Sequence, residues 1–124
     1  MPTADFVLVD TSAWVEHLRK GSPRLKQLLL DGRVCTHDMI IAELALGNVG
    51  PDSDIFRLMQ NLYRLPAVQP TELLYFIKKR NLAQQGIGYV DANLLASAAL
   101  RQNIRILTHD RHLASCAQQL DLAY

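Results

Sequence analysis

The spacing of apolar residues changes several times along the chain, and each change separates a predicted strand from a predicted helix. Residues 6–9 (FVLV) form an uninterrupted apolar run, which is typical of a strand buried on both faces of a parallel sheet. Similar short runs predict strands at residues 33–36, 66–68 and 104–107, and residues 122–124 are a candidate edge strand.

Between the predicted strands, apolar residues recur at helical spacing. Ala13, Trp14 and Leu18 would share one face of a helix that follows the first strand. Ser22 and Pro23 are typical of the first residues of a second helix. The same signals predict helices at residues 38–46, 52–62, 71–85, 89–102 and 111–120. Strands that alternate with helices predict an α/β fold, with a central parallel sheet of four to five short strands flanked by helices.

Length and composition are those of an ordinary globular protein. The 124 residues fit a single domain, 1–124, and 49% hydrophobic residues can supply one sizeable core. No apolar run approaches the roughly 20 residues that a membrane span requires. The first five residues lack the basic and apolar regions of a secretory signal. We therefore expect a cytoplasmic protein that makes no membrane contact.

The charge is nearly balanced, with 13 basic and 12 acidic residues and a formal net charge of +1. This balance excludes a strongly basic, histone-like protein, but it leaves room for a local basic surface. Two basic clusters occur, and we interpret each as a solvated helix face. They are Arg19, Lys20, Arg24 and Lys26, and then Lys78, Lys79 and Arg80.

The two cysteines, Cys35 and Cys116, have apolar neighbours in the sequence. This environment is typical of buried thiols in a reducing compartment. A zinc site drawn from Cys35, His37, His109 and His112 is an alternative, but no pair of these residues has zinc-finger spacing.

Four acidic residues occupy positions where a parallel sheet collects its ligands. Asp10 directly follows the first predicted strand and Asp110 comes just after the strand at 104–107. Asp91 lies in the first turn of a predicted helix, and Glu43 lies on the helix after the second strand. Since the carboxyl ends of parallel strands share one edge, these carboxylates should meet there. Mg²⁺ or Mn²⁺ would offset their mutual repulsion, because both ions prefer carboxylate and water oxygens.

Each acid also has an ordinary structural interpretation. Asp10 could cap the first helix, Asp91 could stabilise a helix dipole, and Asp110 could begin a turn. Glu43 could be a solvated helix residue. The combination is more informative than any single acid, because two of the four follow predicted buried strands.

Four short segments resemble, in order, the motifs of PIN-domain ribonucleases, in particular the VapC toxins of bacterial toxin–antitoxin pairs. They are LVDTSAW at residues 8–14, IAEL at 41–44, GYVDA at 88–92 and LTHDR at 107–111. Each motif is short, but their order and their spread over the whole chain agree with the family.

The resemblance implies a PIN-like three-layer fold and a Mg²⁺- or Mn²⁺-dependent endoribonuclease. Such a protein would be the toxin of a type II pair that cleaves RNA with a metal-activated water. It would form a homodimer and be held inactive by a VapB-type antitoxin.

The resemblance also assigns residues by position, and the acidic quartet would be Asp10, Glu43, Asp91 and Asp110. Of these, Asp10, Asp91 and Asp110 would bind the metal directly or through water. Glu43 would bind metal or orient the attacking water. The family's active site offers further hydroxyls that could hydrogen-bond these carboxylates or waters, here those of Thr11, Ser12 and Thr108.

The chain departs from the family at His112, where many relatives carry a further acid. This change weakens the case for a second metal ion. His112 could instead contact phosphate or protonate the leaving oxygen. The ordinary interpretation is a surface histidine.

Two other classes of protein require residues that this chain lacks. A dehalogenase-type phosphatase would need a second Asp where Ser12 stands, and a dinucleotide-binding protein would need Gly-x-Gly-x-x-Gly after the first strand. A non-catalytic PIN-fold module that binds RNA or protein is the main alternative, although such a module would be expected to lack one or more of the acids. A dimer or antitoxin surface could include Trp14, Leu58, Met59, Leu62 and Tyr63, which core packing would also explain.

Overall fold

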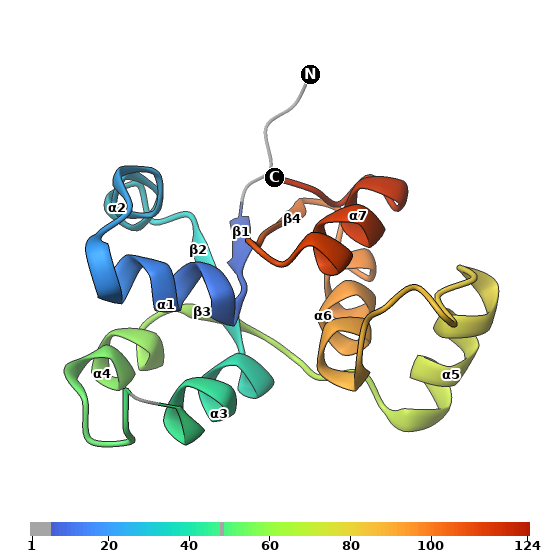
Figure 1. The fold of residues 1–124 in the computed structure, drawn as a ribbon, viewed down its shortest axis with the longest axis horizontal. Helices are drawn as coiled ribbons and strands as arrows, with labels where there is room; N and C mark the ends of the chain where they lie inside the picture. The colour runs from blue at the N-terminus through green and yellow to red at the C-terminus, as the bar shows by residue number, and fades with distance from the viewer. Residues whose placement is uncertain (1–5, 48) are drawn as a thin grey trace.

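The apolar run at residues 6–9 forms β1 (Phe6–Val9), an inner strand of a parallel sheet (Figure 1). The computed structural model describes residues 6–47 and 49–124, so the segment 1–5 on which the signal-peptide argument rests lies outside the described residues. The sheet has the order β3-β2-β1-β4, and all three strand pairings are parallel. The other strands are β2 (Val34–His37), β3 (Tyr63–Leu65) and β4 (Ile104–Leu107).

The third strand was predicted at residues 66–68, and this prediction is wrong by three residues. β3 pairs with β2 through Tyr63, Arg64 and Leu65. Pro66 cannot donate a backbone hydrogen bond to a sheet. The N–H and C=O groups of Val68 bond instead to the side chain of Asn93, each at 3.1 Å.

The candidate edge strand at residues 122–124 contributes one bridge beside β4. Ala123 pairs in parallel with Ile106. The Ile106 N–H donates to the Leu122 carbonyl at 2.7 Å, and the Tyr124 N–H donates to the Ile106 carbonyl at 3.0 Å. Residues 122–124 therefore lie beside β4.

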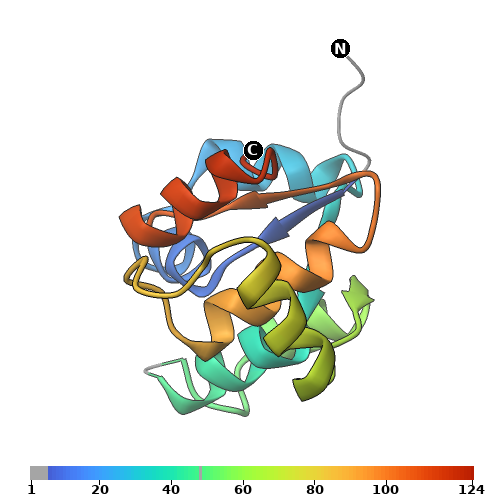
Figure 2. The same cartoon turned by 90° about the vertical axis from the view of Figure 1, so that its right-hand side faces the viewer.

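Seven helices surround the sheet within the described residues, as the alternating pattern predicted. Helices α6 and α7 both pack on β4, and Figure 2 shows them on opposite sides of β1 and β4. The helices are α1 (Thr11–Lys20), α2 (Pro23–Leu30), α3 (Asp38–Leu46), α4 (Asp54–Gln60), α5 (Pro70–Lys79), α6 (Tyr89–Ala99) and α7 (Arg111–Gln119). None of the described helices is long and apolar enough to cross a membrane.

Helix α5 is shorter than the predicted 71–85 because the chain turns sharply after Lys79. Asn81, Gln84 and Gly86 have backbone φ angles of 55°, 62° and 79°, a left-handed conformation that interrupts a right-handed helix. Leu82 is almost completely buried in this turn. Burial of that apolar side chain favours the turn over continuation of the helix.

The core lies between the sheet and its helices. Val7, Leu8 and Val9 are fully buried, as expected for a strand covered on both faces. Trp14 and Met59 are also fully buried, so they belong to the core and cannot form the suggested partner surface. Leu58 and Tyr63, at 39% and 40% exposure, remain accessible.

A polar network is buried beside this core. His37 Nδ1 accepts from the Met39 N–H at 3.1 Å, so Nε2 carries the proton and donates to Ser97 Oγ at 3.1 Å. Ser97 in turn donates to the Pro66 carbonyl at 2.9 Å. Burial lowers the pKa of His37, which keeps the ring neutral. The network, together with the bonds from Asn93 to Val68, fixes the segment after β3 against α6.

Both cysteines are free and buried, as predicted. Burial raises the pKa of Cys35 to about 12, so this thiol is inert at neutral pH.

Candidate active site

Asp10 lies where β1 passes into α1, at the carboxyl end of an inner strand. Its N–H donates to the Leu107 carbonyl at 2.9 Å, which ties it to the end of β4. Its side chain is only 5% exposed. Ser12 Oγ and Thr108 Oγ1 both donate to Asp10 Oδ2, at 2.9 and 2.6 Å. Two hydroxyls from segments far apart in sequence therefore orient one carboxylate.

Thr108 also connects Asp110 to Asp10. The Asp110 N–H donates to Thr108 Oγ1 at 3.0 Å, while Asp110 Oδ1 accepts from the Leu113 N–H at 2.9 Å. Asp110 is thus the N-cap of α7, whereas the sequence had suggested a turn at Asp110 and a helix cap at Asp10. The cap uses only Oδ1 of this exposed carboxylate.

Glu43 reaches this edge from α3. Thr11 Oγ1 donates to Glu43 Oε1 at 2.6 Å, which links the first turn of α1 to the middle of α3. Glu43 is exposed, and Thr11 bonds to only one of its two carboxylate oxygens.

Asp91 is half-buried in the first turn of α6. Burial, followed by the negative charges of Asp10, Asp110 and Glu43, raises the pKa of Asp91 to about 6, against a smaller opposing effect of a backbone hydrogen bond at Gly88. Asp10, Asp110 and Glu43 therefore all lie within electrostatic range of Asp91.

The four carboxylates have no paired cation in the part of the chain that the structure describes. Within residues 6–47 and 49–124, none of them forms an ion pair with Lys, Arg or His. In the same part of the chain, no three Asp, Glu, His or Cys side chains form a ready-made metal cage, and the alternative zinc site is likewise not assembled. Water and substrate phosphate would have to complete the coordination of Mg²⁺, which is usual for this ion.

The PIN-domain family model matches residues 7–118, which include all four acids. The chain belongs to the PIN-domain family. It is also similar to proteins named "Ribonuclease VapC32" from two strains of Mycobacterium tuberculosis, CDC 1551 / Oshkosh and H37Rv. In each case 44% of residues are identical over 113 positions, which cover 90% of this chain and 91% of the relative. The resemblance to VapC-type PIN domains is thereby confirmed.

This PIN domain has a further acid at the site that the sequence interpretation missed. Glu16 Oε2 pairs with His109 Nε2 at 2.9 Å, and Glu16 Oε1 pairs with Lys20 Nζ at 2.8 Å. The hydrogen bond from Lys20 lowers the pKa of Glu16. The His109 N–H also donates to Ser12 Oγ at 2.9 Å. The signal was the spacing of four residues that places Ser12, Glu16 and Lys20 on one face of α1.

His112 packs on the segment that precedes α6. A methyl group added at Gly86 would lie 2.6 Å from His112 Nδ1. The His112 imidazole can therefore pack here only because residue 86 has no side chain. The contact joins α7, which Asp110 caps, to the segment that leads to Asp91. His112 therefore has a packing role against Gly86, and its contact with phosphate or with the leaving oxygen stays a prediction.

Proposed function

We propose that this PIN domain is a metal-dependent endoribonuclease and the toxin of a type II toxin–antitoxin pair. The observation that carries the proposal is the convergence of Asp10, Glu43, Asp91 and Asp110 with no paired cation among the described residues. Such a cluster is unfavourable in isolation, and a divalent cation relieves its repulsion. The relatives named ribonuclease support the same chemistry.

Asp10, Asp91 and Asp110 would hold Mg²⁺ or Mn²⁺, directly or through water. Ser12 and Thr108 use only Oδ2 of Asp10, and the helix cap uses only Oδ1 of Asp110. Each of these carboxylates therefore keeps a second oxygen for the cation. When bound, the cation would lower the pKa of a water molecule and stabilise charge on the phosphate.

Glu43 would orient the attacking water and accept its proton. Thr11 fixes one oxygen of the exposed Glu43 side chain, and the other oxygen can accept a hydrogen bond from water. Proton transfer of this kind contributes about 10²- to 10⁴-fold to a rate. We therefore expect Glu43→Gln, which can still accept from Thr11, to lower cleavage by about 100-fold.

The regulation that follows is inhibition by a VapB-type antitoxin. An arginine from this partner could pair bidentately with the carboxylates and compete with the metal. RNA cleavage by a purified complex should be suppressed; undiminished cleavage by a stable complex would contradict this. We also propose a homodimer acting in the cytoplasm, and light scattering over a range of concentrations tests the oligomeric state.

The decisive experiment is cleavage of total RNA by the antitoxin-free chain with Mg²⁺, with Mn²⁺ and with EDTA. Asp10→Asn keeps an acceptor for Ser12 and Thr108 but loses the charge, so cleavage should fall by about 100-fold or more without unfolding. Asp52→Asn, at an exposed position outside the site, is the matched control. Discrete fragments that require metal and disappear only in Asp10→Asn are expected. A folded chain that cleaves none of several RNA pools would favour a non-catalytic binding module.

A further inference from the structure

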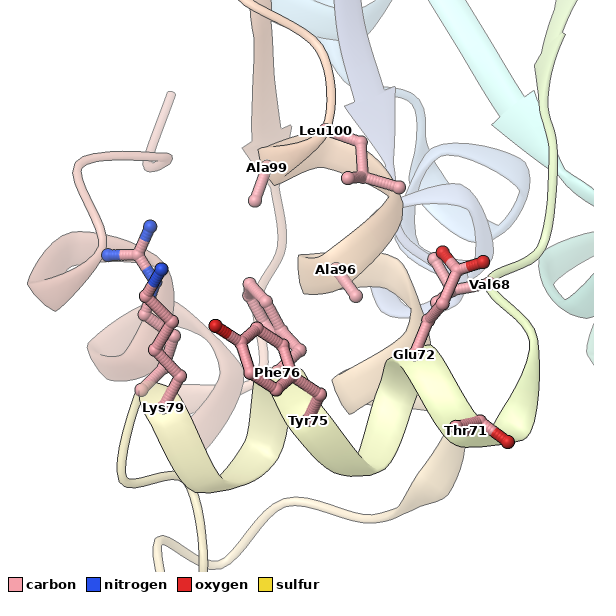
Figure 3. Close-up of a pocket in the computed structure, with 10 residues that line it drawn as sticks. Val68, Thr71, Glu72, Tyr75, Phe76, Lys79, Ala96, Ala99 and Leu100 are labelled. Carbon is pink, nitrogen blue, oxygen red and sulfur yellow. The ribbon is translucent and has the colours of Figure 1, made fainter.

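A surface groove separates α5 from α6, away from the acidic cluster. It has a volume of about 500 Å³ and is largely apolar. Figure 3 shows Phe76 and Tyr75 on α5 facing Ala96 on α6, with Glu72 and Lys79 toward opposite ends. Small alanine side chains on the α6 wall allow a flat group to approach closely.

Two aromatic side chains of this α5–α6 groove each lie close to a cationic side chain. Tyr75 is 66% exposed, although it is a large aromatic residue. The Lys79 ammonium lies 5.7 Å from the centre of the Tyr75 ring, and the Arg80 guanidinium lies 5.9 Å from that of Phe76. These separations are within the range of cation–π attraction.

The basic cluster Lys78, Lys79 and Arg80 is exposed and has no carboxylate partner among the described residues. By contrast, Arg57 and Arg64 each pair with an aspartate. Attraction to the dipole of α5 accounts for cations in its last turn. It does not account for the exposed Tyr75 ring or for the apolar groove beside the cations.

We propose that the α5–α6 groove binds a single-stranded segment of RNA. A base would stack on Tyr75, while Lys79 and Arg80 would pair with the phosphates on either side. Exposed aromatic rings next to unpaired cations are the usual means of binding single strands without sequence preference. An apolar peptide would use the groove floor but would leave these cations unmatched.

The chain connects this groove to the acidic cluster. Arg80 begins the segment that runs past His112 at Gly86 and ends at α6, where Asp91 lies in the first turn. The inference rests on the proposed function only in taking RNA as the substrate, and binding can be measured without cleavage.

The test measures binding of a fluorescent 12-nucleotide unstructured RNA by Asp10→Asn protein, using fluorescence anisotropy at several salt concentrations. Tyr75→Ala should weaken binding about 5- to 100-fold, whereas Tyr75→Phe should bind as tightly as the parent. The double variant Lys79→Ala with Arg80→Ala should reduce the slope of log affinity against log salt by about 1.4. Arg19→Ala with Lys26→Ala removes the same charge elsewhere and is the matched control.

The outcomes separate this inference from the proposed nuclease. If wild type cleaves RNA but neither the Tyr75 nor the Lys79–Arg80 variant changes binding relative to the control, the groove proposal is wrong and the nuclease stands. Selective loss of binding in a chain that does not cleave would support the groove alone. If Tyr75→Leu binds RNA as tightly as the parent protein, a general apolar contact explains the binding and base stacking does not. That result would overturn the proposal. Variants that change only self-association would identify a protein contact instead.

Discussion

The buried His37–Ser97–Asn93 network and the acidic cluster both join distant segments through short polar contacts, but they differ in how fully those contacts are matched. In the buried network a neutral histidine, a hydroxyl and an amide each find partners. In the acidic cluster, hydroxyls orient the carboxylates but no described cation offsets their charge. A matched network stabilises the fold, whereas an oriented set of unmatched charges is suited to bind a cation.

The largest effect on stability should come from breaking the matched network at Asn93. Asn93→Ala would leave the buried N–H and C=O groups of Val68 without partners, so we expect a loss of about 2–4 kcal/mol in the free energy of unfolding. Urea denaturation measures it. Asn61→Ala, at an exposed amide, should change stability by less than about 0.5 kcal/mol. Equal losses of stability in Asn93→Ala and Asn61→Ala would show that the buried network contributes no more than an exposed amide.

A pair of Thr→Val variants compares the two kinds of environment directly. Thr108→Val removes the bond to Asp10 and the acceptor for the Asp110 N–H, so RNA cleavage or metal affinity should fall about 10- to 100-fold. Thr36 Oγ1 is buried and has no partner among the described residues, so Thr36→Val should leave cleavage intact and keep or raise stability. Titration with Mn²⁺ and thermal melting provide both readouts. Unchanged RNA cleavage by the Thr108→Val protein would show that the Thr108 hydroxyl does not contribute to the site.

Variants at the contact between His112 and Gly86 test whether packing near the acidic residues affects RNA cleavage. Gly86→Ala and Gly21→Ala both place a side chain at positive φ, 79° and 82°, at a cost of about 1–2 kcal/mol. Only the first would also collide with another residue, the imidazole of His112. We therefore expect Gly86→Ala to lower cleavage several-fold more than Gly21→Ala, and His112→Ala to restore part of that loss. Equal cleavage by the two glycine variants would show that the contact has no effect on the site.

The dependence of stability on pH should have opposite signs in the two regions. Because burial lowers the pKa of His37 below 6.5, the unfolded chain binds the extra proton and the network loses stability as pH falls below that value. Because the pKa of Asp91 rises from 3.8 to about 6, the folded chain holds the extra proton, so stability falls as pH rises between those values without metal. Denaturation of wild type, His37→Gln and Asp91→Asn over this range separates the two contributions to stability. Mg²⁺ should reduce only the pH dependence that arises from Asp91.

The sequence and the structure agree most closely where local chemistry is strong. An apolar run predicts β1 within its observed bounds, and the order of the four motifs predicts which acids meet. The end of α5 and the position of β3 were missed. Both depend on contacts between distant segments, namely the burial of Leu82 and the bonds from Asn93 to Val68.

The sequence by itself determined the α/β class, the parallel sheet and the identity of the four acids, because residue spacing and the ends of strands are local properties. Only the tertiary structure decided that Thr108 connects Asp10 to Asp110, that Glu16 pairs with His109, and that His112 packs on Gly86. These contacts join residues that β1, β4 and their helices bring together across the sheet. Their geometry depends on how side chains pack in three dimensions, which spacing along a single chain does not specify.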